Sequence, residues 1–199
     1  MLNGKFRGVM VNGTMAFFQE FLKHPRQIAS IVPSSQYLER RVVEAAGVIS
    51  AQNIVELGAG TGKLTRAILR AMRKDAKLLS IEINPHLHGL VNRIKDSRLV
   101  AVCGDARNLN EIIGMNGFGP PEVIISGIPF STMSQRSGSE ILRGISSALL
   151  PGGRFVAYQV SNKVALLSQP LLGQAGVELE LLNIPPMRVY RWEKHLDIS

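Results

Sequence analysis

Short apolar runs alternate with longer amphipathic segments along most of the chain. Runs rich in Val, Ile and Leu predict buried strands at residues 53–57, 77–83, 98–103, 122–126, 154–160, 177–182 and 187–192. Between them, apolar residues at helical spacing predict helices at 62–73, 85–95, 109–113, 136–149 and 163–174. Strands that alternate with helices imply parallel crossovers, whereas the last two strands have no helix between them. The pattern therefore predicts an α/β fold with a doubly wound seven-stranded sheet, mostly parallel with an antiparallel C-terminal strand pair.

Two further helices are expected before the first strand. Apolar residues on one face predict a helix at 14–23, and a serine cap predicts a second helix that ends at Ala46, with Gly47 just beyond it. We assign residues 1–46 to an N-terminal helical segment and 47–199 to the sheet domain. No apolar run approaches the roughly 20 residues of a membrane span, so no transmembrane segment is expected.

Charge and cysteine content limit the classes of protein to consider. The net charge of +8 favours a polyanionic partner, either nucleic acid or an anionic membrane surface, although charge for solubility alone would look the same. The single cysteine, Cys103, excludes a disulfide framework and favours a reducing, cytoplasmic compartment. We expect Cys103 to be a buried strand residue, and no metal site, because one Cys and four scattered His do not form a ligand cluster.

The strongest motif is Glu56-Leu57-Gly58-Ala59-Gly60-Thr61-Gly62, which ends an apolar strand and opens a helix. Glycines here permit a tight turn and a close approach of the backbone to a ligand. Glu82 ends the second strand, where an acid can accept both ribose hydroxyls of a nucleoside, and Asp105 follows the third strand, where it can accept from the adenine amino group. The expected cofactor-binding residues are Glu56, Gly58, Ala59, Gly60, Thr61, Gly62, Glu82, Ile83, Asp105, Ala106 and Ser126.

Together these residues resemble the nucleoside-binding motifs of class I S-adenosylmethionine-dependent methyltransferases. The resemblance covers about residues 53–192 and implies a Rossmann-like fold, an enzyme and S-adenosylmethionine as its cofactor. It also implies that the glycine loop contacts the methionine part and that Glu82 holds the ribose. Two alternatives remain: an NAD-binding protein, and acids that only cap helices or face solvent.

The fourth strand ends in Ser126-Gly127-Ile128-Pro129-Phe130, the loop that faces the transferred methyl in class I enzymes. In adenine-N6 methyltransferases, including the ribosomal RNA dimethyltransferases, the loop reads Asn/Asp-x-Pro-aromatic, and the polar residue and a backbone carbonyl hold the amine. Pro129 and Phe130 match that pattern, but Gly127 has no side chain at the polar position. This departure disfavours an RNA substrate.

A second resemblance, to bacterial phospholipid N-methyltransferases, rests on residues 24–35, 126–130 and 183–191. It implies stepwise methylation of phosphatidylethanolamine towards phosphatidylcholine by a cytoplasmic protein, peripheral on the inner membrane face. The helix at 14–23, flanked by basic residues, could lie in an anionic lipid interface or cover the substrate as a lid. The expected catalytic residues are Ser126, Gly127, Ile128, Pro129, Phe130 and Tyr190.

Aromatic rings attract the quaternary ammonium that forms as methyl groups accumulate. Phe130, Tyr158 and Tyr190 are candidates, although each is also an ordinary core residue, Tyr158 above all. Arg188 and Arg191 could pair with a lipid phosphate. A nucleic-acid methyltransferase and a non-catalytic nucleoside-binding module remain the alternative functions.

Overall fold

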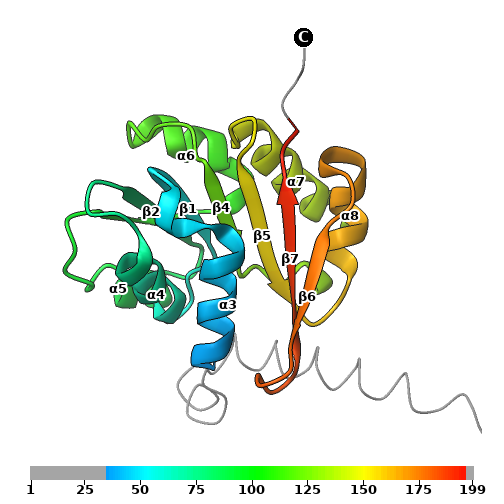
Figure 1. Ribbon diagram of the computed structural model, residues 1–199. Coiled ribbons are helices and arrows are strands. Elements are labelled where there is room, and N and C mark those ends of the chain that lie inside the picture. The colour runs from blue at the N-terminus through cyan, green and yellow to red at the C-terminus, as the bar shows by residue number, and fades with distance from the viewer. Residues whose placement is uncertain (1–34, 196–199) are drawn as a thin grey trace, which may run out of the picture.

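The computed structural model describes residues 35–195, at whose centre a seven-stranded sheet lies between two layers of helices (Figure 1). The strand order is β3-β2-β1-β4-β5-β7-β6. Strands β1 to β5 are parallel, β7 runs antiparallel to β5, and β6 pairs antiparallel with β7. The strands are β1 (Asn53–Leu57), β2 (Lys77–Glu82), β3 (Leu99–Cys103), β4 (Val123–Ser126), β5 (Arg154–Gln159), β6 (Gly176–Glu180) and β7 (Met187–Glu193). The predicted Rossmann-like fold, with its antiparallel C-terminal pair, is confirmed.

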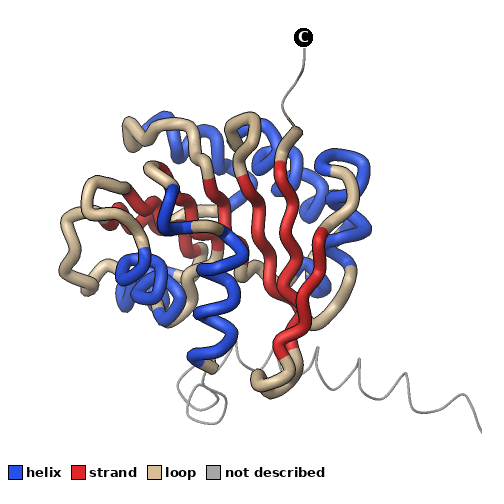
Figure 2. The backbone as a smooth tube through the Cα atoms, viewed as in Figure 1, coloured by secondary structure: helices blue, strands red, loops and turns tan. Residues whose placement is uncertain are grey.

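Helices cover both faces of this sheet (Figures 1 and 2). One face carries α3 (Gln36–Ala46), α4 (Lys63–Ala71) and α5 (Pro85–Val91). The other carries α6 (Leu109–Met115), α7 (Gln135–Ala148) and α8 (Lys163–Leu172). The part of the chain that the structure describes also contains three 3₁₀ turns that the sequence did not indicate: η1 (Val48–Ser50), η2 (Ala106–Asn108) and η3 (Phe130–Thr132). Within residues 35–195 no helix is long and apolar enough to cross a membrane. The helix expected at 14–23 lies outside the described residues.

Capping residues set both ends of α3, as its sequence predicted. The Ser35 side chain accepts a hydrogen bond from the Leu38 N–H, and Gly47 adopts the left-handed conformation with φ 65°. The helix buries its apolar face against the sheet through Leu38, Val42 and Ala46. α3 therefore packs as part of the layer that also contains α4.

The two faces of the sheet bury separate apolar clusters. On the α6–α8 face, Trp192 is 1% exposed and stacks on Phe155 and Tyr190, with ring centroids 4.9 and 5.9 Å away. On the α3–α4 face, Val156, Met187 and Val189 pack against α3 and α4. Alternate residues of β5 and β7 thus enter different cores, as the pleat of a strand requires.

The order at the centre of the sheet creates a ligand crevice. β1 lies between β2 and β4, and the chain leaves β1 towards β2 on one side and leaves β4 towards β5 on the other. Loops that diverge in this way leave a crevice at the carboxyl ends of the strands, where open α/β sheets bind ligands. The fold therefore places the ends of β1, β2, β3 and β4 around one site.

Several expectations need correction, among them the helix expected at 85–95, which ends at Val91. Cys103 is exposed rather than buried, because it is the last residue of the edge strand β3. β6 ends at Glu180 instead of continuing to residue 182, because the Glu180 carboxylate accepts the Leu182 N–H and the chain turns out of the ladder. α4 ends at Ala71, since Met72 is extended with ψ 158°.

Candidate active site

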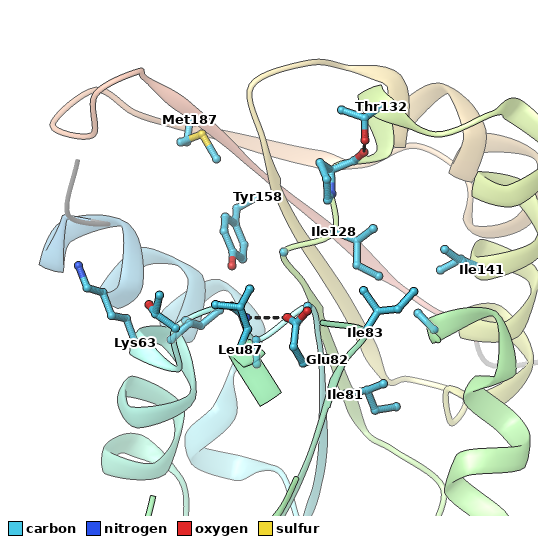
Figure 3. Close-up of a pocket in the computed structure, with 18 of the residues that line it drawn as sticks. Lys63, Ile81, Glu82, Ile83, Leu87, Ile128, Thr132, Ile141, Tyr158 and Met187 are labelled. Atoms are coloured by element: carbon cyan, nitrogen blue, oxygen red, sulfur yellow. Dashed lines mark hydrogen bonds between the residues drawn. The ribbon is translucent and has the colours of Figure 1, made fainter. Parts of the chain in front are cut away.

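A cavity of about 370 Å³ lies at the carboxyl edge of the sheet (Figure 3). Small-molecule sites commonly have volumes of about 300–1,000 Å³. The glycine loop after β1 and the ends of β2 and β3 form one half, and the loop after β4, with parts of α3, β5 and the β6–β7 connection, forms the other. The expected site residues that line it are Gly58, Ala59, Gly60, Thr61, Glu82, Ile83, Asp105, Ala106, Gly127, Ile128 and Pro129.

The glycine loop presents its backbone to the cavity. Gly58 and Gly60 have φ values of 79° and 57°, in the left-handed region that side chains disfavour. A Cβ at Gly58 would approach Ile128 Cγ1 to 3.2 Å, whereas a Cβ at Gly60 would meet no atom within 4 Å. The first glycine thus permits close packing of two loops, and the second leaves open space for a ligand.

Glu82 connects the end of β2 to this loop. Its Oε2 accepts the Gly60 N–H at 2.8 Å, drawn as a dashed line in Figure 3, and its Oε1 accepts the Asn84 N–H at 2.9 Å. The side chain is buried yet lines the cavity. The carboxylate therefore lies where the hydroxyls of a bound nucleoside would find a charged acceptor.

Glu56 lies beneath the loop and does not line the cavity. Its Oε2 accepts hydrogen bonds from the hydroxyls of Thr65 at 2.6 Å and Ser80 at 2.7 Å, so it ties β1 to α4 and β2. Its Oε1 is buried without a hydrogen-bond partner among residues 35–195. Burial raises the pKa of Glu56 to about 7, against the lowering effect of the two hydroxyls, and the nearby charge of Glu82 adds to the rise.

Asp105 reaches the cavity, but Arg107 already uses both of its oxygens. Oδ1 accepts the Arg107 N–H at 2.9 Å, and the guanidinium of Arg107 donates to Oδ2 from Nε and Nη2. The hydrogen bonds from Arg107 hold the pKa of Asp105 below its usual value. Asp105, which we predicted to accept from adenine, thus lines the cavity and is paired with Arg107, a contact that the sequence prediction did not include.

Only some of the predicted catalytic residues in the loop after β4 line the cavity. Gly127, Ile128 and Pro129 line the cavity, while Ser126 and Phe130 are fully buried. The Ser126 hydroxyl accepts the Ile128 N–H at 3.3 Å and so shapes the turn. Phe130 packs in the core on the α6–α8 face.

The carbonyl of Ile128 is already occupied. It accepts hydrogen bonds from Gln159 Nε2 at 2.6 Å and from the Phe130 N–H at 2.9 Å. A carbonyl oxygen has two lone pairs. This backbone acceptor of the loop is therefore not free for a substrate amine.

Gly127 is required by space rather than by backbone conformation. Its φ is not positive, but a Cβ there would lie 2.3 Å from the hydroxyl oxygen of Tyr158 and 3.0 Å from the Gly58 carbonyl oxygen. Tyr158, on β5, lines the cavity. The sequence favoured a core role for Tyr158, because it does not show that β5 lies beside β4 and so brings Tyr158 close to Gly127.

The structure does not bring the other proposed substrate contacts to the cavity. Tyr190 is 2% exposed on the opposite face of the sheet, where its hydroxyl donates to the Ser161 carbonyl at 3.3 Å. Arg188 Nη1 donates to the Val160 carbonyl. Gly62 is the N-cap of α4 and does not line the cavity either.

The β6–β7 connection forms the remaining wall. Asn183, Ile184, Pro185 and Met187 line the cavity. Asn183 is buried, accepts the Ser35 N–H at 3.1 Å and donates to the Pro185 carbonyl at 2.9 Å, so it fixes the connection to the start of α3. Among residues 35–195, no three His, Cys, Asp or Glu side chains gather as a metal site would require.

The strand order and this glycine-lined cavity define a class I S-adenosylmethionine-dependent methyltransferase. The ornithine lipid N-methyltransferase of Singulisphaera acidiphila is 31% identical over 141 residues, which cover 70% of this chain and 73% of that protein. The chain therefore belongs to the family of that lipid N-methyltransferase. It is an S-adenosylmethionine-dependent N-methyltransferase, as the sequence analysis predicted.

Other proteins match over a smaller part of the chain or at a lower sequence identity. Ribosomal RNA small subunit methyltransferase A of Maricaulis maris is 33% identical over 101 residues, which are 49% of this chain and only 34% of that protein. The solved structure of the N-methyltransferase NodS from Bradyrhizobium japonicum, in complex with S-adenosyl-L-homocysteine, superposes with a TM-score of 0.65. It covers 89% of this chain and 98% of that one at 12% identity, which supports the fold alone. No protein-family model matches the chain.

The raised pKa of Glu56 makes stability depend on pH. An acid whose pKa rises on folding holds its proton more tightly when folded, so the free energy of unfolding falls as pH rises from 4.5 to about 7. We expect wild type to lose stability relative to Glu56→Gln across this window, by at most about 1.4 kcal/mol per pH unit. Urea unfolding at several pH values measures this, with the exposed Glu111→Gln as control for the loss of one negative charge. Parallel curves for wild type and Glu56→Gln would contradict a buried, proton-binding Glu56.

Proposed function

We propose that this enzyme methylates the amino group of a membrane lipid, and that phosphatidylethanolamine is converted stepwise towards phosphatidylcholine. The observation that carries the proposal is the apolar β6–β7 connection at the mouth of the cavity. Ile184 lines the cavity yet is 77% exposed, and Leu181 and Leu182 beside it are 68% and 63% exposed. Exposed apolar patches mark surfaces that contact a partner protein, a membrane or a ligand. For an enzyme that acts on a membrane lipid, the partner we propose here is the membrane.

The size of the cavity supports the same substrate class. A volume of about 370 Å³ suits the cofactor and a small head group, and leaves no room for two acyl chains as well. The chains of a bound lipid would stay in the bilayer while the head group enters. Exposed Leu181, Leu182 and Ile184 could then lie against the same bilayer.

The loop after β4 disfavours the RNA alternative. Adenine-N6 enzymes hold the amine with a polar side chain and a backbone carbonyl, and here Gly127 has no side chain while the Ile128 carbonyl already accepts two hydrogen bonds. The lipid relative also matches a larger share of its own length than the RNA relative does, 73% against 34%.

We propose that Glu82 holds the ribose of the cofactor, with the backbone of Gly58 and Gly60 against its methionine part. Two observations support this placement of the cofactor: the buried Glu82 carboxylate at the cavity wall and the open space beside Gly60. The cofactor supplies an activated methyl group. The protein then has to place a neutral amine in line with it, and the apolar cavity destabilises the ammonium form and so favours the neutral one.

The substrate class can be tested by incubating the protein with labelled S-adenosylmethionine and three acceptors: vesicles of phosphatidylethanolamine, vesicles of ornithine lipid, and total RNA. We expect label in phosphatidylethanolamine. Label in ornithine lipid alone would keep the lipid class but replace the substrate, because ornithine also carries a primary amine. Label in RNA and in neither lipid would overturn the proposal.

Removal of the Glu82 carboxylate tests the cofactor site. Glu82→Ala should weaken S-adenosylmethionine binding by about 1.5–3 kcal/mol, the range for hydrogen bonds to a charged group. Titration calorimetry measures the affinity, and Glu111→Ala, at an exposed site on α6, is the matched control. An unchanged affinity in Glu82→Ala would exclude Glu82 as the ribose acceptor.

The membrane contact can be tested at the β6–β7 connection. Ile184→Asp should reduce binding to anionic vesicles roughly tenfold or more, since a buried apolar side chain contributes about 1.5–3 kcal/mol. Added salt should weaken wild-type binding, because the attraction of a chain with charge +8 to anionic lipid is screened. Sedimentation with vesicles measures both effects.

Ile49→Asp is the matched control for this experiment. Ile49 is 75% exposed, close to the 77% of Ile184, but lies in η1 before the amino end of β1, at the opposite edge of the sheet. It should bind vesicles as wild type does. Equal loss in Ile49→Asp and in Ile184→Asp would argue against a contact located at the β6–β7 connection.

A further inference from the structure

We propose that the hydroxyl of Tyr158 accepts a hydrogen bond from the substrate amine and so takes the place of the side chain that Gly127 lacks. This inference rests on the proposed function, since it assigns a residue to the recognition of the lipid amine. It starts from one contact: the hydroxyl oxygen lies 2.3 Å from the position that a Cβ of residue 127 would occupy. A polar group therefore stands beside the reacting loop, although it comes from the neighbouring strand.

The orientation of Tyr158 follows from the register of the sheet. Ala157 pairs with Ser126 across β4 and β5, and Tyr158, the next residue of β5, points to the α3–α4 face. In Figure 3 the ring of Tyr158 lies between Met187 and Glu82, with its hydroxyl on the Glu82 side. The hydroxyl thus points from the substrate half of the cavity towards the cofactor half.

Most other polar side chains at the cavity already have partners. Asn183 uses both ends of its amide within the protein, and Thr132 donates to the Pro129 carbonyl at 2.9 Å. Lys63 lines the cavity but has only N–H donors, so it cannot accept from an amine. The Tyr158 hydroxyl makes no hydrogen bond with residues 35–195 and faces the cavity, so its oxygen can accept one from a ligand.

A neutral phenol can accept a hydrogen bond from the amine, but it does not act as a base that removes a proton. Burial raises the pKa of Tyr158, and the negative charges of Glu56, Glu39 and Glu82 raise it further, so the phenol keeps its proton. Its oxygen can accept one N–H and thereby direct the nitrogen lone pair. In the transfer, the amine nitrogen bonds to the methyl carbon, the carbon–sulfur bond breaks with its electron pair left on sulfur, and the product ammonium releases a proton to water.

The number of N–H bonds on the substrate distinguishes this role from a structural one. Neutral phosphatidylethanolamine has two N–H bonds, its monomethyl derivative has one, and its dimethyl derivative has none. A hydrogen bond to Tyr158 is therefore available in the first two transfers and absent in the third. Tyr158→Phe removes the hydroxyl and keeps the ring, so attraction between the ring and a cationic head group is preserved.

The experiment compares full-length wild type and Tyr158→Phe with each of the three lipids in mixed vesicles, at saturating S-adenosylmethionine. We expect kcat to fall roughly tenfold with phosphatidylethanolamine and its monomethyl derivative, as the loss of one hydrogen bond implies, and to stay unchanged with the dimethyl derivative. The dissociation constant of S-adenosylmethionine, measured by calorimetry, should also be unchanged. Activity on the dimethyl lipid serves as the control for folding.

Two results would overturn the role of Tyr158 alone: an equal loss of kcat with all three lipids, or no loss with any of them. Failure of the wild type to methylate any of the three would instead refute phosphatidylethanolamine as the substrate of the proposed function. The two failures are therefore distinguishable in one set of assays.

Discussion

The site depends on the contact between two backbone turns at the centre of the sheet. The Gly127 N–H donates to the Leu57 carbonyl at 2.9 Å, which extends the pairing of β1 and β4 by one step beyond the strands. A Cβ at Gly58 would lie 3.4 Å from the Ile128 nitrogen, and a Cβ at Gly127 would lie 3.0 Å from the Gly58 carbonyl oxygen. Side chains at either position would separate the loop that faces the cofactor from the loop that faces the substrate. The proposed transfer needs these two loops at short distance, so both positions carry glycine.

Much of the fold follows from local pattern and from one rule of connectivity. Apolar runs locate the strands, and right-handed crossovers make most of them parallel. Parallel strands end at the same edge, so Glu82 and the glycine loop could be placed together from the sequence. Ser35 and Gly47 similarly mark the ends of α3, because their side-chain and backbone properties act within a few residues.

The remaining features of the site depend on pairing and contacts between segments that are far apart in the sequence. Whether Tyr158 or Tyr190 faces the cavity depends on the register of β5 against β7, where Tyr190 pairs with Ala157 and Tyr158 with Val189. Adjacent strand residues point to opposite faces, so a shift of β7 by one residue against β5 would turn Tyr190 to the face that Tyr158 occupies. The Tyr158 hydroxyl, which fills the space beside Gly127, likewise comes from another strand. The pairing of Asp105 with Arg107 is different, since the two residues are close in sequence and an arginine two positions after an acid was a usable signal.

The hydrogen bond between Glu82 and Gly60 has a consequence for the energetics of ligand entry. It joins the carboxylate to the middle of the glycine loop through a contact between two parts of the protein itself. Each carboxylate oxygen has two lone pairs, so Glu82 can accept from an incoming hydroxyl while it still accepts from the Gly60 N–H. A preorganised loop loses little conformational entropy when it meets a ligand, which leaves more of the interaction energy as affinity. The carboxylate thus limits the conformational freedom of the glycine loop.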